Sequence, residues 1–156
     1  MRSAFHSFVL TFLAAGFGLH GQQPGDLTGN WYLNVDKSDW GAAKRPQSVV
    51  LHINHKEPAL RYTGTVAYPN EDTRDFAFDG AIDGKSYPMT RSYGVGSAVL
   101  RRIDTGAFES VFRTDDGSYI ETVRTALSRG GQVLTRKVRL QTPQGTNSWT
   151  EIYERR

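Results

Sequence analysis

The 156-residue sequence predicts an all-β domain, a single antiparallel up-and-down β-barrel of about eight to ten strands. Short runs of alternating apolar and polar residues recur about every 8 to 12 residues, a spacing typical of sandwiches and barrels. Turn pairs such as Asp-Gly and Gly-Gly separate these runs, and no apolar pattern of helical period extends over any length. Because connections this short join antiparallel neighbours, closure into a barrel is the arrangement that removes both sheet edges.

The first expected strand covers residues 27–35, where Trp31 and Leu33 alternate with polar neighbours. Gly29 lets the backbone approach closely, while the Trp31 ring is large enough to plug one end of a core. We therefore predict Gly29 and Trp31 as structural residues at the closed end of the barrel. Residues 36–47 interrupt the alternation, and we expect an irregular segment there, with a single helical turn capping the barrel.

Turn residues mark the remaining strands. Asp83-Gly84 is a strong hairpin signal, because this pair tolerates the positive φ angles of tight hairpin turns. Asp116-Gly117 repeats the same chemistry. The nine further strands are expected at residues 48–55, 60–68, 76–82, 85–89, 98–103, 107–113, 119–127, 132–141 and 147–155.

Several of these strands carry polar residues on both faces. In the strand at 119–127, Glu121 shares a face with Val123, while Thr122 and Arg124 lie on the other. This mixture favours a barrel whose interior is partly polar and holds one small ligand. A plain sandwich with long charged side chains lying over apolar surface is the alternative.

The N-terminus has the form of a secretory signal peptide: an arginine at position 2, an apolar run at 8–19 and small or polar residues at 21–24. The apolar run is too short to span a bilayer, which needs about 20 residues. We therefore predict residues 1–21 as a signal peptide and 22–156 as the mature domain. We expect a secreted or periplasmic monomer without a membrane anchor.

Composition limits the function. There is no cysteine, so disulfides and a lipid anchor on cysteine are excluded. Without Arg2, 18 basic residues face 16 acidic ones, which is not the basic face that a nucleic-acid partner would need.

The sequence shows no convincing catalytic or metal-binding constellation, and we predict no enzyme, no metal and no cofactor. His52 and His55, three residues apart on one strand, face opposite sides and cannot chelate one metal together. Two less favoured alternatives remain open: one histidine as a haem ligand, or a pair of carboxylates acting on glycosides. The candidate acids for such a pair are Glu109, Glu121 and Glu151.

The two ends of the chain resemble a known family. Gly29-Asn30-Trp31-Tyr32-Leu33 resembles the Gly-x-Trp-x-Leu opening of the calycins, the superfamily of lipocalins and fatty-acid-binding proteins, and residues 150–155 look like the last strand of the fatty-acid-binding branch. The chain also resembles secreted bacterial lipocalin-like proteins of unassigned function, in which a Lys-Ser pair follows, here Lys37-Ser38. The resemblance implies a barrel that binds a small apolar molecule, with a basic residue, Arg139 or Arg155, stacked on the tryptophan.

The sequence departs from the fatty-acid-binding pattern at two places. Residues 36–47 are too few for the helix pair of that family. Its last strand presents an arginine and a tyrosine to the ligand carboxylate; Tyr153 matches the tyrosine, but Glu151 stands at the arginine position. Because an acid repels a carboxylate, we expect weak binding of fatty acids and a preference for neutral or cationic apolar molecules.

The expected pocket holds a small, partly apolar molecule between aromatic and methionine side chains, with a few polar fixtures. Glu151 shares a strand face with Tyr153 and is expected to pair with Arg139. A cell-envelope interaction module with a filled barrel is the alternative, and a connected cavity of roughly 300 Å³ or more would favour ligand binding. The predicted ligand-binding residues are Tyr62, Phe76, Phe78, Met89, Phe112, Arg124, Arg139, Glu151 and Tyr153.

Overall fold

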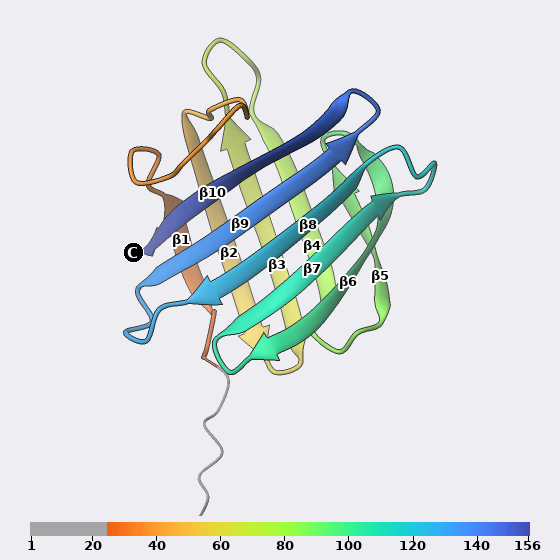
Figure 1. Cartoon of the computed structure of the whole chain (residues 1–156). Coiled ribbons are helices and arrows are strands. Elements are labelled where there is room, and N and C mark those ends of the chain that lie inside the picture. Colours follow the sequence, from red (N-terminus) through yellow and green to blue (C-terminus); the bar gives the residue numbers. More distant parts are fainter. Residues whose placement is uncertain (1–24) are drawn as a thin grey trace, which may run out of the picture.

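A computed structural model describes residues 25–156 and shows ten β-strands (Figure 1). The predicted signal peptide, residues 1–21, lies outside the described residues. The strands are β1 (Gly29–Leu33), β2 (Ser48–Lys56), β3 (Ala59–Ala67), β4 (Arg74–Ala81), β5 (Ser86–Arg91), β6 (Gly94–Asp104), β7 (Ala107–Thr114), β8 (Ile120–Leu127), β9 (Val133–Thr142) and β10 (Gly145–Arg155).

The strands form one closed antiparallel barrel in which each strand pairs with its neighbours in sequence, and β1 closes the ring on β10. The predicted up-and-down barrel is confirmed. Pairs at the closing seam include Trp31 with Arg155 and Leu33 with Tyr153. The chain enters at the end of the barrel that carries the short turns between β2 and β3, β6 and β7, and β8 and β9 (Figure 1).

The segment between β1 and β2 forms turns instead of the expected helical turn. It is tied to the last strand by backbone hydrogen bonds exchanged between Asp39 and Thr150, at 2.9 and 2.7 Å. The Ser38 hydroxyl also accepts from the backbone N–H of Ile152, at 3.0 Å. These bonds hold the segment over the end of the barrel opposite the chain entry.

The seam between β4 and β5 is the shortest ladder of the barrel. Only two register pairs join these strands, Ala77 with Thr90 and Phe78 with Met89. Nine pairs join β2 to β3, from Ser48 with Ala67 to Lys56 with Ala59. The wall is therefore least supported by backbone hydrogen bonds between β4 and β5.

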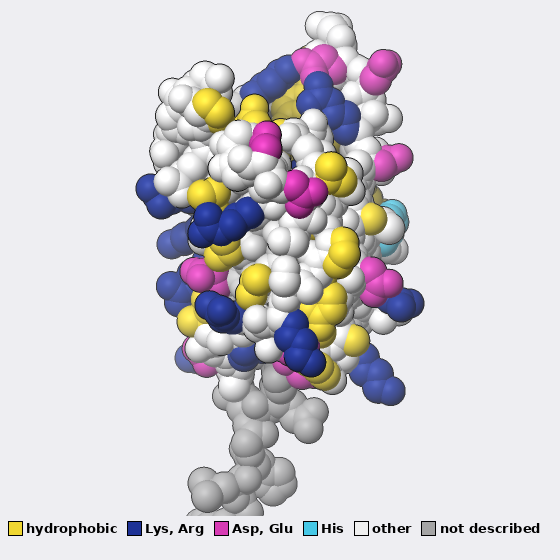
Figure 2. Space-filling model, turned by 90° about the vertical axis from the view of Figure 1, so that its right-hand side faces the viewer, with side chains coloured by type: hydrophobic (Ala, Val, Ile, Leu, Met, Phe, Trp, Pro, Cys, Tyr) yellow, Lys and Arg dark blue, Asp and Glu magenta, His cyan; other side chains and the backbone are white. Residues whose placement is uncertain are grey.

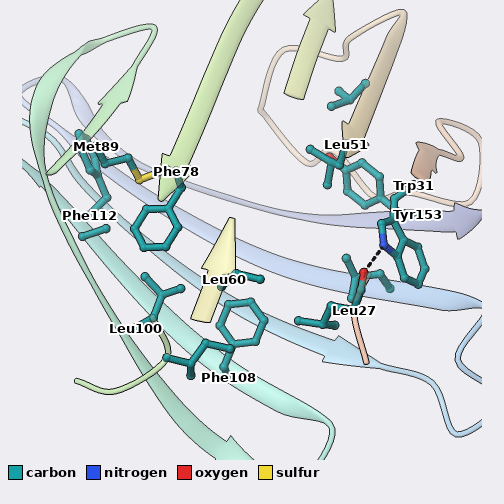
Figure 3. Packing of buried hydrophobic residues seen from close by; sticks show 14 residues of the cluster. Leu27, Trp31, Leu51, Leu60, Phe78, Met89, Leu100, Phe108, Phe112 and Tyr153 are labelled. Carbon is teal, nitrogen blue, oxygen red and sulfur yellow. Dashed lines mark hydrogen bonds between the residues drawn. The ribbon is translucent and has the colours of Figure 1, made fainter. Parts of the chain in front are cut away.

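Trp31 plugs the chain-entry end of the barrel. Its side chain is fully buried, and its indole Nε1 donates to the carbonyl of Leu27 at 2.9 Å (Figure 3). The Leu27 backbone N–H in turn donates to Nδ1 of buried His55, at 3.3 Å. The guanidinium of Arg155 lies 4.6 Å from the centre of the Trp31 ring, so Arg155, not Arg139, fills the stacking position.

The face of the barrel shown in Figure 2 carries interspersed acidic and basic side chains with small apolar areas between them. Exposed ion pairs such as Arg61 with Asp79, at 2.7 Å, connect neighbouring strands on the outside of the barrel. No helix in the described part of the chain is long and apolar enough to cross a membrane.

Candidate functional site

Two cavities lie inside the barrel. The lower cavity, near the Trp31 plug, has a volume of only about 40 Å³ and is lined mainly by leucine and aromatic side chains. The upper cavity, beneath the β1–β2 segment, has a volume of about 270 Å³. Phe76 and Arg136 line both cavities and thus lie at the boundary between them.

The upper cavity has an apolar wall and a lid. Val49, Val66 and Val138 contribute wall side chains from β2, β3 and β9, and Trp40 and Pro46 come from the β1–β2 segment. Trp40 is fixed there because its Nε1 donates to the carbonyl of Val35, at 3.2 Å. Apolar surface therefore surrounds the charged groups described next.

The first charged group is an ion pair across the barrel interior between Arg91 on β5 and Glu121 on β8. Arg91 Nη2 lies 2.5 Å from Glu121 Oε1, and the two side chains are only 10% and 9% exposed. The Tyr93 hydroxyl donates to the other carboxylate oxygen, also at 2.5 Å. The Arg91 guanidinium lies 5.2 Å from the centre of the Phe76 ring, close enough for a cation–π contact.

The second charged group pairs Arg136 on β9 with Glu151 on β10, at 2.7 Å. Both oxygens of Glu151 are occupied: Oε1 accepts from the Trp149 indole at 2.8 Å, and Oε2 accepts from both Arg136 and the Tyr153 hydroxyl, the latter at 3.0 Å. The carboxylate is thus held inside the barrel by three protein donors.

The electrostatics keep the Arg91–Glu121 pair charged. Burial alone would raise the pKa of Glu121, but the charges of Arg91 and Arg136, with the Tyr93 hydrogen bond, outweigh it and lower that pKa below its ordinary value. Burial and the neighbouring carboxylates raise the pKa of both Tyr93 and Tyr153. At neutral pH the tyrosines are therefore neutral donors and Glu121 is ionised.

Room for Phe76 comes from a glycine on the neighbouring strand. Gly64 pairs with Phe76 across β3 and β4, and a Cβ atom at Gly64 would lie 2.3 Å from the Phe76 ring. The absence of a side chain at Gly64 therefore lets the ring lie across the interior between the two cavities.

The structure divides the predicted ligand-binding residues into three groups. Tyr62 and Phe76 line a cavity, as do Glu151 and Tyr153. Three others are buried in the packed core and line neither interior cavity. Those three are Phe78, Met89 and Phe112 (Figure 3).

Arg124 and Arg139 were wrong as interior residues, because both side chains are exposed. On β8, Arg124 lies between the buried residues Val123 and Thr125 and so points outward. On β9, Arg139 follows the buried Val138 and is paired in register with Ser148, whereas Glu151 is opposite Arg136. The expected Glu151–Arg139 pair is therefore replaced by Glu151–Arg136.

Sequence reasoning missed Arg91 and Tyr93 and did not include Arg136 in the pocket. One signal was available: Arg91 is two residues after Met89 and therefore shares its inward face. Glu121 was noted only as a possible catalytic acid, and Glu109, named with it, is exposed on β7.

Neither histidine lies at the upper cavity. His52 is exposed, with Nδ1 at 2.7 Å from Asn30 Oδ1, and His55 is buried beside Leu27 at the plug. Within residues 25–156, no group of three or more histidine, aspartate or glutamate side chains is placed to hold a metal ion.

A closed barrel of ten antiparallel strands around an interior cavity defines a calycin-like fold. The fold is similar to that of a fatty acid binding protein from Schistosoma mansoni, solved in complex with arachidonic acid. The TM-score is 0.54 at 10% sequence identity, and the similarity covers 83% of this chain and 96% of the other. No protein-family model and no curated protein matches the sequence, so the similarity extends to the fold alone.

Proposed function

We propose that this protein binds a small, partly apolar molecule in the upper cavity. The observation that carries the proposal is the occurrence of two buried ion pairs, Arg91–Glu121 and Arg136–Glu151, in the wall of a cavity whose other lining residues are mainly valines and aromatic residues. Ligand sites are typically apolar cavities with a few convergent polar groups that fix orientation. At 270 Å³ the cavity is just below the roughly 300 Å³ that was expected of a ligand carrier and at which ligand pockets usually begin, so only a small ligand would fit. The similar Schistosoma protein was solved in complex with arachidonic acid, which supports binding of an apolar molecule by this chain.

We further propose that the protein acts without covalent chemistry, as a secreted or periplasmic monomer. A glycosidase mechanism needs one carboxyl group that is protonated when the substrate binds. Glu121 is held ionised beside Arg91, and both oxygens of Glu151 accept hydrogen bonds. These acids stabilise the cavity wall and are poorly suited to donate protons.

Titration of the protein with an environment-sensitive apolar dye tests the proposal, together with mass spectrometry of the intact protein under non-denaturing conditions. Trp149 lines the cavity, so its fluorescence reports on binding there. We expect saturable binding of one dye per chain, with a change in tryptophan emission that a Trp149→Phe variant reduces and a variant with both Trp40 and Trp149 replaced by Phe loses. Absence of dye binding and of any co-purified molecule would instead favour an interaction module.

A further inference from the structure

The wall of the upper cavity has more hydrogen-bond donors than free acceptor sites. Glu121 accepts from Arg91 and Tyr93, one on each carboxylate oxygen. Glu151 likewise has both oxygens occupied. Five protein donors thus occupy most of the roughly eight lone-pair acceptor sites of the two carboxylates.

The arginine donors are not used up. A guanidinium carries five N–H donors, and Arg91 and Arg136 each give one hydrogen bond to a carboxylate. Arg91 is nine-tenths buried, and its Nε has no hydrogen-bond partner among the described residues. Because an unpaired buried donor is unfavourable, the wall has a surplus of donors over acceptors.

The four buried charges of the wall sum to zero in spite of this surplus, because Arg91 and Arg136 are balanced by Glu121 and Glu151. A further lining cation, Lys44, is mostly exposed at the rim, where it contacts Glu71 on the β3–β4 loop. The neutral side chains Ser92 and Asn147 are exposed at the rim. A buried ligand charge would thus have no counter-charge left.

We infer that the ligand is an uncharged molecule whose apolar body carries a hydrogen-bond acceptor, such as a carbonyl or ether oxygen. This acceptor is directed at the arginine guanidinium groups. The inference rests on the proposed function. A carboxylate would find donors but no net positive charge. An ammonium group would find few free acceptor sites and no free negative charge. The cavity therefore disfavours cations, in contrast to the sequence-based expectation drawn from Glu151 alone.

Dye displacement by nonan-2-one, nonanoate and nonylamine tests this inference at one chain length. We expect nonan-2-one to bind at least about tenfold more tightly than nonylamine, equivalent to about 1.4 kcal/mol, with nonanoate between them. Binding of nonylamine as tight as that of the ketone, with the dye still bound, would overturn the inference and leave the proposed function standing. Failure of the dye itself to bind would overturn both.

Two variants connect the preference to the arginine donors. Arg91→Met combined with Glu121→Gln removes the guanidinium and one negative charge together, and we expect it to lose the preference for the ketone over the amine. Arg139→Met, which changes an exposed arginine on the outside of β9, is the matched control and should keep it. If the double variant does not fold, Arg91→Lys preserves the charge but not the planar donor set, and we expect a reduced preference. An unchanged preference in the folded Arg91 variants would overturn the inference.

Discussion

Arg91 and Glu121 lie on strands that are not neighbours, β5 and β8, yet their side chains meet at 2.5 Å inside the barrel. Strands β6 and β7 separate them in the sheet. The ion pair is thus a direct connection across the interior, independent of the backbone ladder. Removal of one partner would leave the other charge buried and unpaired.

Glu121→Ala should therefore lower the free energy of unfolding by about 3 to 5 kcal/mol, as is usual when one partner of a buried ion pair is removed. Glu109→Ala, at an exposed position on β7, should change it by less than about 0.5 kcal/mol. Urea denaturation of both variants measures the difference. Equal midpoints would show that the pair contributes no stability.

Trp31→Ala should destabilise the barrel by about 3 to 5 kcal/mol, since it replaces a fully buried ring by a cavity. Trp40→Ala should cost less, because Trp40 lies half-buried in the β1–β2 segment. Thermal or urea unfolding of the two variants gives the comparison. A larger loss for Trp40 would contradict the assignment of Trp31 as the plug.

Acid should weaken the fold through Glu121. Its pKa in the folded state lies below the ordinary value of 4.5, so its ionisation stabilises the folded state above that pH. This contribution is lost as the pH falls from 4.5 through the lower folded-state pKa. Urea midpoints between pH 7 and pH 3 should fall less steeply for the Arg91→Met/Glu121→Gln double variant than for the unmodified protein. Parallel curves would exclude Glu121 as a source of the pH dependence.

Glu151→Arg should raise the affinity for carboxylate ligands. The substitution removes a negative charge, adds a positive one and releases Arg136 from its partner, so the wall gains net positive charge. The affinity for nonanoate, measured by dye displacement, should increase about tenfold or more, which corresponds to roughly 1.4 kcal/mol of binding free energy. Glu109→Arg, on the outer surface, is the control and should leave nonanoate affinity unchanged.

Gly64→Ala should destabilise the protein by about 1 to 3 kcal/mol, the usual cost of overpacking, because the new methyl group would overlap the Phe76 ring. Combination with Phe76→Leu should recover part of the loss, since the two positions share one space. Gly130→Ala, where nothing lies within 4 Å of the added atom, should have little effect. Additive losses in the double variant would argue against a Gly64–Phe76 clash.

The number of strands was predictable because turn chemistry and two-residue alternation are local properties of the sequence. The inward position of Glu151 followed from the same alternation through Tyr153. Its partner was not predictable, because the β9–β10 register depends on turn geometry and an offset of one residue reverses which side chains face inward. Arg136, three residues from Arg139, consequently occupies the interior.

The identity of the cavity residues was only partly predictable for a different reason. Phe78 and Phe76 share one face of β4, so sequence periodicity treats them alike. Only the depth of each ring within the barrel separates the buried Phe78 from Phe76, which borders both cavities. Depth depends on strand tilt and on the packing of the whole interior.

The short β4–β5 ladder has a consequence for the timing of ligand exchange. Phe76 on β4 and Arg91 on β5 lie on the two sides of that seam, and both line the upper cavity. A molecule bound there would contact both β4 and β5, the neighbouring strands with the fewest register pairs between them. An occupied barrel should open more slowly along this line than an empty one, so a bound molecule would itself prolong its residence by closing the wall around it.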